Sequence, residues 1–256
     1  MTDLSRRSER TYYDTFFSSL ESERVDQGVG FQLLRRAQAD YLCRRLQSFA
    51  ATGIVLSMGC GNGEIEMLLD DTVGRVFAFD LSLAGLIAGS VRAAQRNLAH
   101  LSFGQASVTE LPVSTESCDA VLLLSLLHHL QPFRRVEALN EVYRVLRAGG
   151  WFIAYDPSQW RAVRLVKFLV RKKYDALHSP DEDEVSPRQM QRLARTIGFD
   201  QVQVEFFDLF IDPLTWLCPD MPPRLFKVLY TLDRAFVRVP GRQLASNFFL
   251  VGHKPS

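Results

Sequence analysis

The chain has 256 residues, 47% of them hydrophobic and 23% charged, a composition that indicates a globular protein with one large domain and excludes a disordered or fibrous one. Its 30 basic and 29 acidic residues leave a net charge of +1, so the basic excess typical of nucleic-acid binding proteins is missing and we expect no nucleic-acid partner. The N-terminal segment is too polar for a signal peptide and the longest apolar run is too short for a membrane span, so we expect a cytoplasmic protein.

The first predicted element is a helix over residues 31–50, which leads into a strand-helix-strand unit. Its apolar face consists of Leu33, Leu34, Ala37, Tyr41, Leu42 and Leu46, with arginines opposite. A buried strand is predicted at residues 53–58, then a helix from about Gly63 and a second buried strand at residues 75–80.

Strands and helices continue to alternate through the middle of the chain. We predict a helix after Ser82, strands at residues 101–106 and 118–125, a helix at 135–147 and a strand at 150–156. Because helices separate these strands, parallel pairing is expected.

The last hundred residues are less regular. A basic segment at residues 161–173 and an acidic loop at 179–187 precede a helix at 187–198. Alternation then predicts a strand at 199–210, and the last strand lies at 246–254. Between these two strands, an aromatic- and proline-rich insertion at 211–241 is expected to carry one or two short helices.

The turn after the first strand contains Gly59, Gly61 and Gly63. A glycine-rich turn between a strand and a helix lets a ligand approach the backbone closely. Glu64 follows the turn directly, and its charge opposes a bound pyrophosphate, which argues against a dinucleotide. Asp80 ends the second strand, where a carboxylate can accept hydrogen bonds from the ribose hydroxyls of an adenosine or cap the next helix.

Five motifs together resemble a known family. They occur in this order and at the expected distances: "LSMGCGNGE", "VFAFDLS", "TELPVSTESCDAV", "LLHHL" and "YRVLRAGGWF". The chain resembles the class I S-adenosylmethionine-dependent methyltransferases, in particular the branch of the ubiquinone and menaquinone biosynthesis and natural-product methyltransferases. The resemblance covers residues 36–156 strongly and the end of the chain more loosely.

The resemblance implies an α/β fold, with a doubly wound, mostly parallel, seven-stranded Rossmann-like sheet whose last strand is antiparallel. An N-terminal helical lid and an inserted helical segment before the last strand accompany the sheet. We expect one methyltransferase domain over residues 1–256, divided into N-terminal helices or lid at 1–50, a cofactor-binding core at 51–157, substrate-side helices at 158–199 and 211–241, and C-terminal hairpin strands at 200–210 and 246–254.

The resemblance also implies a site for S-adenosylmethionine. Its expected residues are Tyr13, Ser57, Gly59, Cys60, Gly61, Gly63, Asp80, Leu81, Ser107, Val108, Leu124 and Ser125. The glycines would line the methionyl end, Asp80 would bind the ribose, and Tyr13 with Asp14 resembles the aromatic and acidic pair of the lid helix. No metal is required, and the widely spaced Cys43, Cys60, Cys118 and Cys218 predict no metal site.

Three positions depart from the family pattern. Ser57 and Ser107 stand where acidic residues are usual, and Ala148 stands where proline is usual. The two serines remove acceptors for the cofactor's amino group and adenine amine, so weaker affinity is expected, and Ser57→Asp is expected to tighten binding.

Methyl transfer to a hydroxyl or an acidic carbon would use a base near the methyl group. His128 and His129 follow the fourth strand and are the candidate bases, while capping or packing is the alternative for both; Asp156 is another residue facing the acceptor. We expect a small or lipophilic acceptor, with O-methylation preferred over C- or N-methylation.

The segment 161–173 and the apolar residues of the insertion predict either contact with an anionic membrane or a lid that packs on the sheet. The competing functions are a non-catalytic binding protein with the same fold and, less favoured, an NAD-linked oxidoreductase. The sequence leaves the oligomeric state open.

Overall fold

A computed structural model describes residues 3–18, 28–50, 53–69, 73–159, 185–237 and 242–256. The whole basic segment singled out in the sequence, residues 161–173, lies outside these ranges, as does most of the acidic loop at 179–187.

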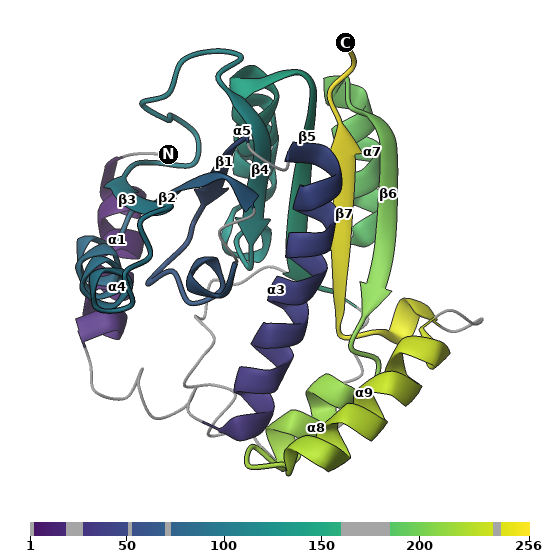
Figure 1. Ribbon diagram of the computed structural model, residues 1–256. Helices are drawn as coiled ribbons and strands as arrows, with labels where there is room; N and C mark the ends of the chain where they lie inside the picture. The colour runs from purple at the N-terminus through teal and green to yellow at the C-terminus, as the bar shows by residue number, and fades with distance from the viewer. Residues whose placement is uncertain (1–2, 19–27, 51–52, 70–72, 160–184, 238–241) are drawn as a thin grey trace.

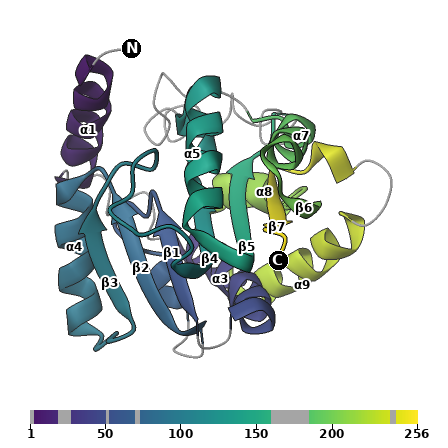
Figure 2. The ribbon, with the colours of Figure 1, turned by 90° about the horizontal axis from the view of Figure 1, so that it is seen from above.

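Within the described residues, one seven-stranded sheet has the order β3-β2-β1-β4-β5-β7-β6 (Figures 1 and 2). The strands are β1 (Ile54–Met58), β2 (Arg75–Asp80), β3 (Leu101–Gln105), β4 (Cys118–Leu124), β5 (Leu146–Pro157), β6 (Asp200–Phe207) and β7 (Asn247–His253). The pairs among β1 to β5 are parallel, whereas β7 is antiparallel to both β5 and β6. This arrangement confirms the predicted doubly wound sheet with an antiparallel last strand.

Helices cover both faces of the sheet. The helices are α1 (Asp3–Ser18), α3 (Val29–Ala50), α4 (Leu83–Gln95), α5 (Pro132–Val145), α7 (Pro187–Ile197), α8 (Ile211–Leu217) and α9 (Pro223–Phe236). In the ranges given above, the short 3₁₀ helices with defined bounds are η1 (Glu66–Leu68), η3 (Leu127–His129) and η4 (Arg242–Leu244). Figure 2 shows α5 and α7 on one face and α3 on the other.

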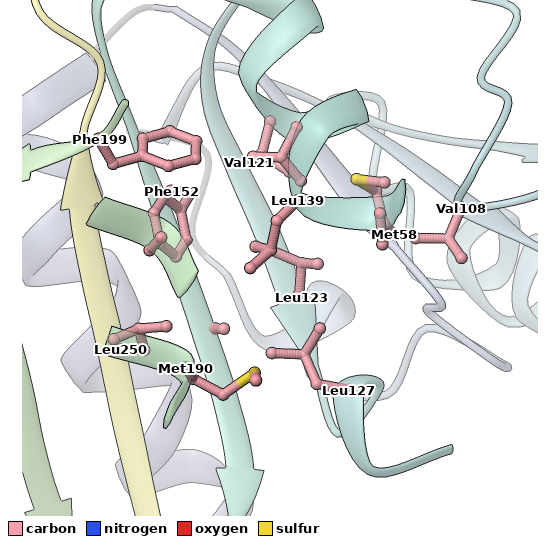
Figure 3. Close-up of a cluster of buried hydrophobic side chains, with 14 of the residues drawn as sticks. Met58, Val108, Val121, Leu123, Leu127, Leu139, Phe152, Met190, Phe199 and Leu250 are labelled. Atoms are coloured by element: carbon pink, nitrogen blue, oxygen red, sulfur yellow. The ribbon is translucent and has the colours of Figure 1, made fainter. Parts of the chain in front are cut away.

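Two buried apolar clusters hold these layers together. One joins β1, β4 and β5 to α5 and α7, and Figure 3 shows its members Val121, Leu123, Leu139, Phe152 and Met190 side by side. The second cluster joins the opposite face of the sheet to α3, including its residues Tyr41, Leu42 and Leu46. Continuous burial on both faces explains why the central strands are apolar throughout.

The prediction of an α-helix from about Gly63 is wrong. In the described residues this connection contains no α-helix, and the 3₁₀ turn Glu66–Leu68 lies in the place of the predicted helix start. Gly63 has a φ of +73°, and Leu69 is extended with a ψ of 135°, so neither side of the turn continues a helix.

The insertion between β6 and β7 forms α8 and α9, as predicted. Figure 1 shows both helices at the end of the sheet to which the β6 arrow points, which is also the carboxyl end of the parallel strands. Among the described helices, none is long and apolar enough to cross a bilayer.

Candidate active site

A cavity of about 340 Å³ lies at the carboxyl ends of β1, β2 and β4. Its lining residues are Tyr13, Phe17, Arg35, Gly59, Cys60, Gly61, Asn62, Glu64, Ile65, Glu66, Asp80, Leu81, Ala106, Val108, Leu124, Ser125, Leu126, His129 and Leu130. In open parallel sheets, ligands bind at the carboxyl ends of the strands, at the point where the strand order reverses and the connections from adjacent strands run to opposite faces of the sheet.

The glycine turn lines one wall of the cavity and leaves its backbone uncovered. Gly59 and Gly61 have φ values of +72° and +56°, which favour glycine. A Cβ atom at Gly61 would lie 2.8 Å from Cζ of Phe17, a residue of the helix α1. The turn therefore provides a cradle that side chains at these positions would fill.

Asp80 fixes the turn to the start of α4. Its carboxylate accepts hydrogen bonds from the backbone N–H of Gly61 (2.7 Å) and of Ser82 (2.8 Å). Burial raises the pKa of Asp80, and these backbone donors oppose that shift. The carboxylate lines the cavity, so a ligand's hydroxyl groups can reach it.

Ser57 lies behind the cavity wall and contacts Glu66, a residue that sequence reasoning missed. Ser57 is fully buried, and its Oγ donates to Oε1 of Glu66 at 2.6 Å. Burial raises the pKa of Glu66 to about 7, with further increases from the charges of Asp80 and Glu64, while the Ser57 hydrogen bond lowers it. A carboxylate thus faces the cavity where the sequence suggested only a serine.

Glu64 is paired with arginines. Its Oε2 lies 3.1 Å from Nε of Arg35, and its Oε1 lies 3.7 Å from Nη1 of Arg92. These contacts partly offset the charge that argued against a bound pyrophosphate in the sequence. Arg35 comes from α3 and itself lines the cavity.

The helix α1 closes the cavity and is fastened to α4. Asp14 accepts hydrogen bonds from Ser82 Oγ (2.7 Å) and from the backbone N–H of Ala84 (3.1 Å). Burial raises the pKa of Asp14, but these hydrogen bonds outweigh it and lower the pKa. Tyr13 is adjacent in sequence, and its hydroxyl lies 2.9 Å from Nδ1 of His129.

The two neighbouring histidines have different surroundings. His129 lines the cavity with Tyr13. His128 is buried, and its Nδ1 and backbone N–H both lie within hydrogen-bond distance of Oδ1 of Asp156, at 2.8 Å and 3.0 Å. Asp156 is fully buried, and burial raises the pKa of its carboxyl group well above its usual value. Asp156 therefore holds the 3₁₀ turn that carries both rings.

Most residues predicted for the site come together. Those that line the cavity are Tyr13, Gly59, Cys60, Gly61, Asp80, Leu81, Val108, Leu124, Ser125 and His129. Ser57, Gly63, Ser107 and His128 are outside the lining, and Ser107 Oγ instead lies 3.0 Å from Oγ1 of Thr109. The binding and catalytic roles of all these residues stay predictions.

Several lining residues had no signal that sequence reasoning used. Glu66 falls in a segment whose periodicity indicates a helix, and Arg35 falls on the polar face of α3. Phe17 lies three positions after Asp14, but the resemblance gives it no role. Among the described residues, no cluster of three His, Cys, Asp or Glu side chains is suited to a metal ion. The cavity thus offers carboxylates, uncovered backbone and one histidine for chemistry.

Residues 56–154 match the family described as methyltransferase domain. The chain is 22% identical over 225 residues to a demethylmenaquinone methyltransferase of Oceanobacillus iheyensis, covering 79% of this chain and 92% of that protein. It is 32% identical over 108 residues to a ubiquinone/menaquinone biosynthesis C-methyltransferase of Brucella anthropi, covering 41% of this chain and 40% of that protein. Several curated relatives are matched over about half of their length or less.

A solved structure of a similar protein agrees with the fold. It is an S-adenosylmethionine-dependent methyltransferase from Archaeoglobus fulgidus, with a TM-score of 0.60 and 18% identity, covering 86% of this chain and 94% of that one.

Proposed function

We propose that the protein uses S-adenosylmethionine to methylate a small or lipophilic metabolite bearing an acidic hydroxyl group, because residues 56–154 match the methyltransferase domain family and the relatives and solved structure named above are methyltransferases. Bound S-adenosylmethionine would supply an electrophilic methyl group whose sulfur leaves uncharged. The uncovered glycine turn and the Asp80 carboxylate fit the cofactor's methionyl end and ribose. The same relatives and solved structure are described as methyltransferases and not as NAD-linked oxidoreductases, which favours the methyltransferase over that alternative.

The observation that carries the proposal is the contact between Tyr13 and His129 on the cavity wall. When Nδ1–H of His129 donates to the Tyr13 oxygen, Nε2 holds the lone pair that can accept a proton. A base in this place removes the hydroxyl proton of the acceptor as its oxygen attacks. Phe17 and Leu126 add apolar walls that exclude water.

The expected result of His129→Ala is a fall in turnover of about a hundredfold or more, with the affinity for S-adenosylhomocysteine nearly unchanged. Tyr13→Phe should shift the pH dependence of turnover, because the partner that orients the ring is lost. Labelled methyl transfer measures turnover, and calorimetry measures affinity. Unchanged turnover in His129→Ala would remove this residue from the mechanism.

One calorimetric experiment tests the function as a whole. S-adenosylmethionine and S-adenosylhomocysteine should bind, and NAD should not. If none of the three binds, a partner-binding protein on the same fold is the better account. Screening lipophilic hydroxylated metabolites with a radiolabelled methyl donor then identifies the acceptor.

C-methylation is a second candidate, since the Brucella relative is described as a C-methyltransferase. If the acceptor is a phenol, removing the proton of its hydroxyl group also makes the adjacent ring carbon nucleophilic. His129 would therefore serve as the base in both O-methylation and C-methylation. A ¹³C-labelled methyl group distinguishes them, because an O-methyl and a C-methyl carbon have well-separated NMR shifts.

The exposed side of α9 supports peripheral contact with an anionic membrane. Its large apolar side chains Leu225, Val228, Leu232 and Phe236 are 49%, 58%, 47% and 53% exposed. Their spacing places them on one side of the helix, and the exposed Arg224 and Lys227 accompany them. Such a helix can lie in the plane of a membrane surface and place the sheet's carboxyl edge near a lipophilic acceptor.

A further inference from the structure

Glu66 is a buried carboxylate whose charge no described cation neutralises. It is 2% exposed and lies on the cavity wall, yet no lysine or arginine in the described part of the chain forms an ion pair with it. A buried carboxylate without a cation is costly, since its charge has lost hydration and gained no partner. Its place therefore suits a ligand that brings a positive charge.

Other charged groups around Glu66 do not supply that partner. Asp80 on β2 and Glu64 in the turn are anionic and raise its pKa. Arg35 on α3 is the arginine that lines the same cavity, and it pairs with Glu64 at 3.1 Å. Cys60 is a neutral thiol, because burial raises its pKa well above the usual value. Glu66 is therefore the carboxylate on this wall that is best placed to bind a cationic group of a ligand.

We propose that Glu66, held by the hydroxyl of Ser57, recognises the ammonium group at the methionyl end of the cofactor, so that cofactor affinity depends on the ionisation of Glu66. The inference rests on the proposed use of S-adenosylmethionine. Asp80, the neighbouring carboxylate, already accepts two backbone N–H groups and is positioned by them. Oε1 of Glu66 accepts a hydrogen bond from Ser57, and the carboxylate has further lone pairs that can accept from a charged donor.

The two neighbours have separate tasks in this arrangement. Ser57 donates to Oε1 and fixes the carboxylate against the end of β1, at 2.6 Å. Charge-assisted hydrogen bonds between a carboxylate and an ammonium are shorter and stronger than neutral ones. Ser57 is then a positioning residue, and Glu66 is the residue that touches the cofactor.

The affinity should depend on pH in one direction. The pKa of Glu66 is about 7 without ligand. Below this pH the carboxyl group is protonated and must lose its proton before it can pair with an ammonium, so binding weakens as pH falls. Between pH 7.5 and pH 5.5 the dissociation constant for S-adenosylhomocysteine should rise about tenfold or more.

A ligand without the amino-acid end provides the comparison. 5′-Methylthioadenosine keeps the adenosine and the sulfur but lacks the ammonium and carboxylate groups. Its affinity, measured by calorimetry over the same pH range, should change little. Glu66→Gln should weaken binding of S-adenosylhomocysteine by ten- to a hundredfold at pH 7.5, remove the pH dependence, and leave binding of 5′-methylthioadenosine unchanged. Glu137→Gln, at an exposed position of α5, is the matched control.

Variants at Ser57 separate recognition from folding. Ser57→Ala removes a hydrogen bond that lowers the pKa of Glu66, so the midpoint of the pH dependence should move to higher pH. Ser57→Asp alone should weaken binding, opposite to the expectation from sequence, because two carboxylates at hydrogen-bond distance repel each other. The exchange variant Ser57→Asp/Glu66→Ser returns one carboxylate and one hydroxyl to the pair and should restore affinity.

The outcomes separate this inference from the proposed function. If both ligands bind but Glu66→Gln and pH leave the affinity for S-adenosylhomocysteine unchanged, the inference is wrong and the cofactor assignment stands. If neither ligand binds at any pH, the cofactor assignment and the inference both fail.

Discussion

Gly61 shows how one residue connects the glycine turn, the helix α1 and the cavity. Its φ of +56° is strained for other residues, and a Cβ atom there would meet Phe17 of α1 at 2.8 Å. Gly149 has a similar φ of +78°, but a Cβ atom there would have Ser256 Oγ as its nearest neighbour at 3.7 Å, an ordinary contact. Comparing the two glycines therefore separates the effect of backbone strain from the effect of contact with α1.

We expect Gly61→Ala and Gly149→Ala to cost similar stability, about 1–3 kcal/mol, because both force alanine into the left-handed region. Gly61→Ala alone should displace α1 and increase amide hydrogen exchange in residues 10–18. It should also weaken binding of S-adenosylhomocysteine. Equal exchange in α1 of both variants would show that Phe17 does not depend on the space at Gly61.

At the scale of elements, one side of α9 exposes the apolar side chains Leu225, Val228, Leu232 and Phe236. Wild-type protein should co-sediment with vesicles of phosphatidylcholine and phosphatidylglycerol at low salt, and Val228→Ser/Leu232→Ser should reduce the bound fraction several-fold. Ile87→Ser/Val91→Ser changes two apolar residues of α4 that are 56% and 53% exposed, so it controls for general loss of surface hydrophobicity.

Absence of wild-type binding to anionic vesicles at low salt would remove the membrane contact. Equal losses in the two double variants would indicate non-specific adsorption through any apolar surface. Binding that persists with pure phosphatidylcholine would show that Arg224 and Lys227 contribute little.

Sequence patterns predicted the strands well because burial on both faces gives each strand a continuous apolar run. They failed between β1 and β2, where glycines at positive φ end the regular backbone and the next turn is only three residues long. Because the sequence predicts an α-helix in this segment, nothing in the sequence indicates that the Glu66 side chain lines the cavity.

Contacts between distant segments explain what else the sequence could not provide. Arg35 reaches Glu64 from α3, and Tyr13 reaches His129 across 116 positions of the chain. The pattern of polar and apolar residues carries no information about which side chains of two distant segments meet. The sequence therefore predicted the types of residue in the site better than their partners.

At the scale of the whole molecule, buried carboxyl groups should make stability depend on pH. Asp208 is 1% exposed, and burial with the nearby charges of Asp212 and Asp233 raises its pKa to about 7. Glu66 has a pKa of about 7 for related reasons. A carboxyl group whose folded pKa is raised stabilises the fold below its unfolded pKa and loses that contribution as pH rises through the folded value.

Thermal unfolding should therefore show a midpoint that falls as pH rises from about 5 to about 8. Asp208→Asn keeps an oxygen acceptor for Tyr155 and Asn247 but has no charge, so it should flatten this dependence and raise the unfolding free energy at pH 8 by about 1–3 kcal/mol. Asp220→Asn, at an exposed position, should leave the slope intact. A slope unchanged in Asp208→Asn would assign the effect to other groups.

The two ends of the α8–α9 insertion are joined by a backbone hydrogen bond next to the sheet. The backbone N–H of Ser246 donates to the Asp208 carbonyl at 3.0 Å, directly beyond the paired ends Phe207 and Asn247 of β6 and β7. An insertion that leaves and re-enters through adjacent antiparallel strands can be exchanged as a unit without changing the register of the sheet. Chimaeras joined at Asp208 and Ser246 would therefore test whether the insertion selects the methyl acceptor, while the cavity at the ends of β1, β2 and β4 stays the same.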